Sequence, residues 1–107
     1  KLSNMIYLQE GQAFKGYVSE VCKTHGITKE EMFSKTKERR IVDARQMLFY
    51  LCVKRKIRIK HIENFMEEMG LPTPHSTIIH HHTTMLKKMR SDGDIRTVAK
   101  HIASCVN

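Results

Sequence analysis

The distribution of proline and of apolar residues restricts this chain to helices. Both prolines, Pro72 and Pro74, lie in one short stretch of the 107 residues, so the rest of the sequence lacks the residue that most strongly breaks a helix. Apolar residues recur at helical spacing along most of the chain, and no run alternates apolar and polar residues over the length of a strand. The sequence therefore predicts an all-α fold, and its length is that of one small helical bundle, residues 1–107.

Capping residues delimit the expected helices. Gly26 and Gly70 are placed as C-terminal stops. Thr28 and Glu31 have the spacing of a capping box, which predicts a short helix carrying Met32. Longer helices are expected over residues 9–25, 38–54, 58–69 and 94–106.

The helix that follows the turn at residues 71–74 is the best specified element. Thr73 is expected as its N-cap and Pro74 as its first helical residue, where the missing N–H is not needed. An arc of apolar residues and one histidine is expected to face the core: Ile78, Ile79, His82, Met85, Leu86 and Met89. The opposite face presents polar side chains: Ser76, His80, Thr83 and Lys87.

The last two helices before residue 94 have the arrangement of a helix-turn-helix over about residues 58–90, with a short Gly-containing turn between them. The major groove of DNA admits one α-helix, and the N-terminal turn of the second helix enters it. Ser, Thr and His side chains there can hydrogen-bond to base edges, and the first-turn N–H groups favour phosphate. This pattern predicts a DNA-binding face.

The charge of the chain agrees with a polyanionic partner. Nineteen Lys and Arg residues against eleven Asp and Glu residues give a net charge of +8. Cations gather in residues 35–45 and again in residues 54–60, whereas acids concentrate at residues 30–31 and 67–68. A solvated basic surface without a partner is the alternative interpretation. A membrane partner is disfavoured because no helix with a Trp- or Phe-rich apolar face accompanies the cations.

Two segments carry a family resemblance. Residues 74–80 read Pro-His-Ser-Thr-Ile-Ile-His and residues 41–47 read Ile-Val-Asp-Ala-Arg-Gln-Met. Together they resemble the C-terminal DNA-binding domain of the bacterial replication initiator DnaA, over about residues 17–90. The resemblance implies a Trp-repressor-like all-α fold that binds double-stranded DNA through a helix-turn-helix in the major groove and a basic loop in the minor groove. It implies no catalytic activity and no cofactor.

The resemblance also assigns residues to roles. His75, Ser76 and Thr77 match the base- and phosphate-contacting start of the recognition helix. Lys37 matches a minor-groove arginine and Arg45 a phosphate-contacting arginine, whereas Pro74 stands where the family has a base-reading aspartate. The expected DNA-binding residues are Lys35, Lys37, Arg39, Arg40, Arg45, Lys54, His75, Ser76, Thr77, His80, Thr83 and Lys87.

Other functions are weighed against this one. The histidines at 80–82 are predicted not to form a metal site, because successive helical residues point about 100° apart. The rival class is a protein-interaction module that keeps the fold and no longer reads bases, docking through Met-rich or acidic surfaces. The odd cysteine count, read as core thiols, favours a cytoplasmic protein of a bacterial or phage-infected cell, with a role in replication initiation or transcription control.

Overall fold

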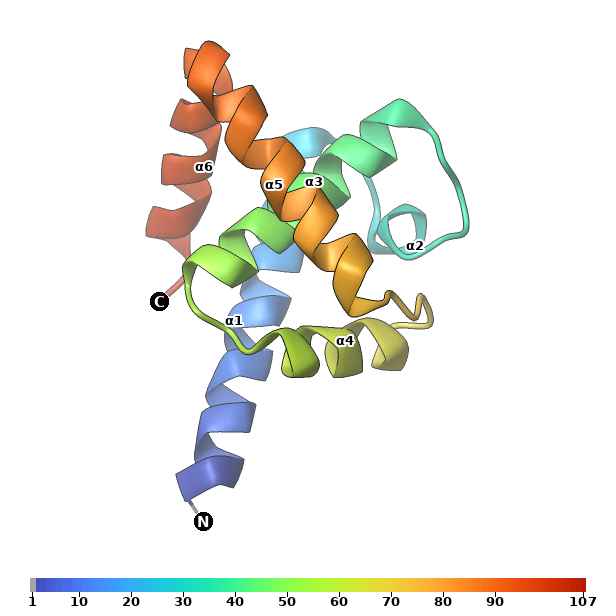
Figure 1. The fold of residues 1–107 in the computed structure, drawn as a ribbon, viewed down its shortest axis with the longest axis vertical. Coiled ribbons are helices and arrows are strands. Elements are labelled where there is room, and N and C mark those ends of the chain that lie inside the picture. The colour runs from blue at the N-terminus through green and yellow to red at the C-terminus, as the bar shows by residue number, and fades with distance from the viewer. Residues whose placement is uncertain (1) are drawn as a thin grey trace.

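The computed structural model describes residues 2–107 as an assembly of helices (Figure 1). The helices within this span are α1 (Leu2–His25), α2 (Lys29–Met32), α3 (Arg39–Lys54), α4 (Ile59–Glu68), α5 (His75–Ser91) and α6 (Gly93–Cys105). The predicted all-α fold is confirmed. Helices α3 to α6 begin and end close to the predicted positions, which are marked by capping and turn residues.

Helix α1 begins earlier than the sequence pattern indicated. It starts at Leu2 rather than near residue 9, and its buried side chains all lie between Ala13 and Cys22. The N-terminal part projects beyond the other helices (Figure 1) and exposes Leu2, Met5 and Leu8. The prediction failed here because this segment packs few of its side chains, so its apolar spacing gives only a weak signal.

Helix α3 is the centre of the bundle. Helices α1 and α5 both pack on it, and α5 crosses in front of α3 in Figure 1. Its side chains are buried almost continuously from Ala44 to Cys52, and Leu48 and Phe49 are at most 1% exposed. Most methionines also fill the core: Met32, Met47, Met66, Met85 and Met89. Helix α5 is thus anchored directly on one buried helix, whereas α4 packs on α1 and α5.

Three helices end on a residue in the left-handed backbone region. Gly26 and Gly70 have φ values of 65° and 89°, as the predicted stops require, and Lys56 has 69°. In each case the next residue donates its backbone N–H to a carbonyl of the last helical turn; Leu71 donates to Met66 O at 3.0 Å. The turn between α4 and α5 therefore has a defined geometry that depends on Gly70.

The starts of α2, α4 and α5 differ in how they are capped. The capping box of α2 is present as predicted, with Thr28 and Glu31 exchanging hydrogen bonds. The start of α4 takes its acceptor from another helix, because Glu10 of α1 accepts the Arg58 N–H at 3.1 Å. The predicted cap of α5 is wrong by one residue. Pro74 is its N-cap, and the Thr73 hydroxyl instead donates to Leu71 O in the turn at 2.9 Å.

Two of the three cysteines lie in the core. Cys22 and Cys52 are buried as expected of core thiols, whereas Cys105, for which the same was expected, is exposed near the end of α6. None of the helices within residues 2–107 is long and apolar enough to cross a membrane.

Candidate nucleic-acid interface

Helices α4 and α5 form the predicted helix-turn-helix, and α5 is held on the bundle by its inner face. Ile78 is fully buried and Met85 is 3% exposed. The ring of His81 stacks on Phe49 with centroids 5.6 Å apart, and the ring of His82 stacks on Tyr50 at 5.9 Å. Stacked rings and apolar contacts together set the rotation of α5 about its own axis.

This rotation differs from the predicted one. Ile79 and Leu86 were expected to face the core, but their side chains are 37% and 40% exposed. His81 takes part of the space assigned to them, because α3 offers the flat ring of Phe49 at that point. The predicted arc was centred on Ile78, Ile79, His82, Met85, Leu86 and Met89, and this left His81 outside it. Helix α5 consequently carries apolar side chains on its solvent side.

The outer face of α5 is the set of side chains that point away from α3: Ser76, Ile79, His80, Thr83 and Lys87. All five are exposed, as is His75 at the start of the helix, while Thr77 is half-buried. No protein element covers the outer face within residues 2–107. It therefore offers hydroxyl groups, one imidazole and one branched alkyl chain to a partner.

A polar contact locks α5 to the first half of α3. The Lys88 ammonium donates to Asp43 Oδ1 at 3.0 Å and to Gln46 Oε1 at 2.6 Å. Gln46 is 5% exposed, so its side-chain oxygen depends on Lys88 for a partner. None of these residues was among the predicted site residues. The contact joins residues more than forty positions apart, and no local pattern in the sequence indicates it.

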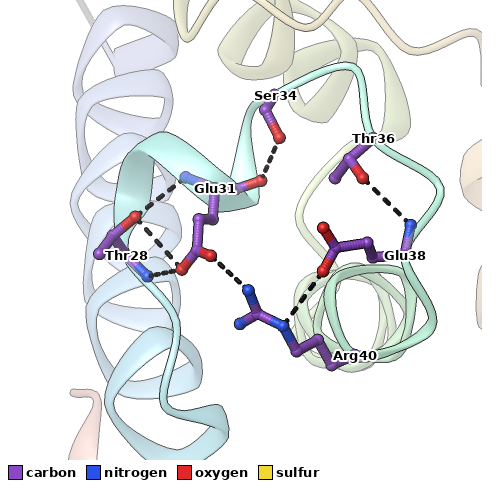
Figure 2. Close-up of polar contacts among 6 residues, drawn as sticks. All are labelled: Thr28, Glu31, Ser34, Thr36, Glu38 and Arg40. Atoms are coloured by element: carbon purple, nitrogen blue, oxygen red, sulfur yellow. Dashed lines mark hydrogen bonds and ion pairs between the residues drawn. The ribbon is translucent and has the colours of Figure 1, made fainter.

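The basic loop, residues 34–38, connects α2 to α3. Lys35 and Lys37 are exposed in it, and neither forms an ion pair with any residue of the described chain. Arg40 holds the outside of the loop, because its guanidinium pairs with Glu31 on α2 and with Glu38 at the end of the loop (Figure 2). Hydrogen bonds from the Thr28 backbone and from Arg40 hold the pKa of Glu31 below its ordinary value.

Arg45 lies in a different place from the predicted one. A phosphate-contacting residue should present its guanidinium to solvent, but Arg45 is only 8% exposed. Its Nε donates to Met32 O at 2.7 Å and its Nη1 to Thr36 O at 2.9 Å, and its Nη2 donates to Ser34 O. Burial lowers the pKa of this guanidinium below its ordinary value. The side chain is bound to the basic loop from inside.

A groove joins the basic loop to the helix-turn-helix. It has a volume of about 460 Å³ and is lined by the basic loop, by Val42 and Arg45 of α3, by Leu71 of the turn and by His81 of α5. Lys35 and Lys37 stand on its rim together with the start of the turn. The structure thus brings together two segments that lie more than thirty residues apart in the sequence.

Two of the predicted cations, Arg39 and Lys54, lie at opposite ends of α3. Arg39 is exposed at the start of α3, next to the basic loop, with Asp43 at 3.9 Å. Lys54 lies at the other end of α3, about 22 Å away along the helix axis. There it donates to the Tyr50 hydroxyl at 3.2 Å and borders a separate groove between α3, α5 and α6. The structure therefore does not bring Lys54 to the basic loop.

His81 is the buried polar group of this region. Its Nδ1 is inaccessible to solvent and has no hydrogen-bond partner among the described residues. Burial lowers the pKa of His81 below its ordinary value, and the charges of His80, Arg45 and Lys88 lower it further. The imidazole is therefore neutral at pH 7.

Residues 2–107 contain no group of three or more His, Cys, Asp or Glu side chains placed to share a metal ion.

A helix-turn-helix with an uncovered outer face on its second helix, beside a loop of exposed cations, defines the class of helix-turn-helix nucleic-acid-binding modules. The family described as bacterial dnaA protein helix-turn-helix matches residues 18–90, about two thirds of the chain. The chain belongs to this family, and membership implies DNA binding. No curated protein and no solved structure matches the chain.

Proposed function

We propose that this protein binds double-stranded DNA with sequence preference, with the outer face of α5 in the major groove and the basic loop in the adjacent minor groove. The observation that carries this proposal is that the basic loop lies beside the helix-turn-helix, because Lys35 and Lys37 line one groove together with Leu71 of the turn and His81 of α5. Single helix-turn-helix modules combine a recognition helix with a separate arm in this manner.

In this proposal the outer face of α5 recognises the DNA bases. Ser76, His80 and Thr83 follow one another at successive turns of the helix and offer hydrogen-bonding groups to base edges. Ile79 lies among them with a branched alkyl chain, which suits the C5-methyl group of thymine. Contacts of this kind distinguish one base pair from another by about 1–3 kcal/mol each.

Affinity that is independent of sequence falls to the cations. Lys35 and Lys37 line the groove, Arg39 is exposed next to the basic loop at the start of α3, and Lys87 lies farther along the outer face of α5. Each cation that neutralises one phosphate adds about 0.9 to the slope of log affinity against log salt concentration. At the start of α5 the backbone N–H groups of His75 and Ser76 favour a phosphate oxygen, whereas the N–H of Thr77 already donates to Pro74 O at 3.0 Å.

The biological role we propose is replication initiation or transcription control in a bacterial or phage-infected cell, with DNA as the partner. Pro74 stands where the family has a base-reading aspartate, and a proline ring cannot accept a hydrogen bond from a base. We therefore expect a recognised site that differs from the DnaA box at the position read by that residue.

Selection from a random duplex library, followed by sequencing, tests the proposal. An enriched sequence motif is the expected result, together with affinity for that motif that falls steeply between 50 and 200 mM salt. A matched variant, Ser76→Ala with His80→Ala, should keep the salt dependence and lose enrichment of the motif. Weak binding to every duplex, with no salt dependence, would instead favour the protein-interaction module.

A further inference from the structure

The interior contact between Arg45 and the basic loop has a consequence for DNA binding. The guanidinium donates to the carbonyl oxygens of residues 32, 34 and 36, which are alternate residues from the end of α2 into the basic loop. Arginine can do this because its five N–H donors are arranged in a rigid planar fork. The segment from the end of α2 into the basic loop is thus wrapped around one side chain of α3.

Side-chain exposure alternates from residue to residue over residues 34–37 of the basic loop, and this contact accounts for it. Ser34 and Thr36, whose carbonyls bind Arg45, are half-buried, whereas Lys35 and Lys37 are exposed. Exposure alternates over residues 34–37 although the backbone bends at residues 34 and 35. Binding the carbonyls of residues 34 and 36 to the interior therefore directs both lysines outward, onto the rim of the groove that faces α5.

The loop has few other constraints. Ser34 donates its hydroxyl to Glu31 O at 2.8 Å and Thr36 accepts the Glu38 N–H at 3.2 Å, both within the segment itself (Figure 2). Arg40 fixes the two ends through Glu31 and Glu38. Within the described chain, Arg45 supplies the hydrogen bonds to the Ser34 and Thr36 carbonyls that tie the middle of the loop to α3.

We propose that Arg45 is a positioning residue for DNA binding, which holds the basic loop so that Lys35 and Lys37 reach the duplex, and that it does not itself bind phosphate. This inference rests on the proposed function. It differs from a phosphate contact in a testable way. An ammonium group also binds phosphate, as a point charge. Its three donors radiate from a single nitrogen, however, so it cannot reproduce the fork in which three different nitrogens of Arg45 reach three separate carbonyls.

The first experiment is tryptic cleavage of the full chain without DNA, which reports on the loop alone. Arg45→Lys should speed cleavage after Lys35 and Lys37 at least tenfold, with circular dichroism showing that the helices persist. Arg55→Lys is the matched control, because Arg55 also binds backbone carbonyls, those of Val106 and Asn107, far from the basic loop. It should leave cleavage after Lys35 and Lys37 unchanged. Equal cleavage in Arg45→Lys and wild type would overturn the positioning role, whatever the DNA result.

The second experiment is a mutant cycle measured as affinity for a mixed-sequence duplex at 50 mM salt. In the wild-type background, Lys35→Ala combined with Lys37→Ala should weaken binding at least tenfold. In the Arg45→Lys background, the same pair should weaken it less than threefold, because the lysines are no longer held in place. An equal loss in both backgrounds, with Arg45→Lys alone binding like wild type, would show a phosphate contact and overturn the proposal. If the wild-type chain binds no duplex, the proposed function fails, and the role of Arg45 in DNA binding fails with it.

Discussion

Substitution by alanine at two adjacent isoleucines on α5 should affect different properties, the stability of the fold at Ile78 and DNA recognition at Ile79. Ile78 is fully buried against α3, whereas Ile79 is 37% exposed on the outer face. Ile78→Ala removes buried alkyl groups and leaves a cavity, which typically costs about 2–5 kcal/mol of unfolding free energy. In a domain with a total stability of about 5–15 kcal/mol, this lowers Tm by about 10 °C or more.

Ile79→Ala should instead change DNA reading. Its stability cost should stay below about 1 kcal/mol because the side chain is partly in solvent already. If Ile79 packs on a thymine methyl, losing that contact removes about 0.8 kcal/mol, the value of one buried methylene-sized group. This corresponds to an affinity loss of about fourfold.

The assay compares the selected duplex with duplexes in which single thymines are replaced by deoxyuridine, which removes only the C5-methyl group. Wild type should bind one such duplex about fourfold more weakly, and Ile79→Ala should bind the two forms equally. Leu86→Ala is the matched control, since Leu86 is 40% exposed on the same helix but about 10 Å farther along its axis. The reasoning is refuted if Ile79→Ala keeps the full preference for thymine over deoxyuridine, or if both isoleucine variants lose the same stability.

Four further predictions concern charge, capping and pH. Lys37→Ala should reduce the slope of log affinity against log salt by about 0.9, measured by fluorescence anisotropy, while Lys15→Ala on α1 should leave it unchanged. Pro74→Asp should raise the unfolding free energy by about 1 kcal/mol in urea melts, because the N-cap of α5 has no side-chain acceptor; an unchanged midpoint contradicts this. Thr28→Ala should cost about 1 kcal/mol in the same assay by removing the capping box of α2, and a loss below about 0.3 kcal/mol would count against that box. Burial lowers the pKa of His81, so the unfolded chain takes up a proton first as pH falls and stability drops below about pH 6.5; Tm measured at pH 7.5 and 5.5 should differ less in His81→Leu than in wild type.

Much of the fold follows from local signals in the sequence. The capping box at Thr28 and the glycines at positions 26 and 70 mark helix ends by backbone chemistry that acts within a few residues. The stop at Lys56 carries no such signal, because a lysine at positive φ is tolerated only in its tertiary setting. The start of α1 was missed for the related reason that its first turns project from the bundle.

The candidate site was predicted less completely than the fold. Exposed residues such as Ser76, His80 and Lys37 lie where the polar face and the basic segment placed them. Arg45 was assigned to phosphate, although its donors bind carbonyls of the basic loop and of the last residue of α2. Charge in a sequence indicates that a residue can meet an anion; it does not show which acceptor the fold brings within reach.

The sequence by itself determined the helical class, most helix ends, the basic character and the family, because these depend on residue types and short spacings. Only the tertiary structure decided the rotation of α5. That rotation depends on the rings of Phe49 and Tyr50 on α3, on which His81 and His82 stack. The stacked residues are more than thirty positions apart in the sequence. The same packing turned Ile79 outward, whereas Arg45 is held inward by the carbonyls of residues 32, 34 and 36. A helical pattern specifies which residues share a face, but the surface of the neighbouring helix determines which of several similar faces is buried.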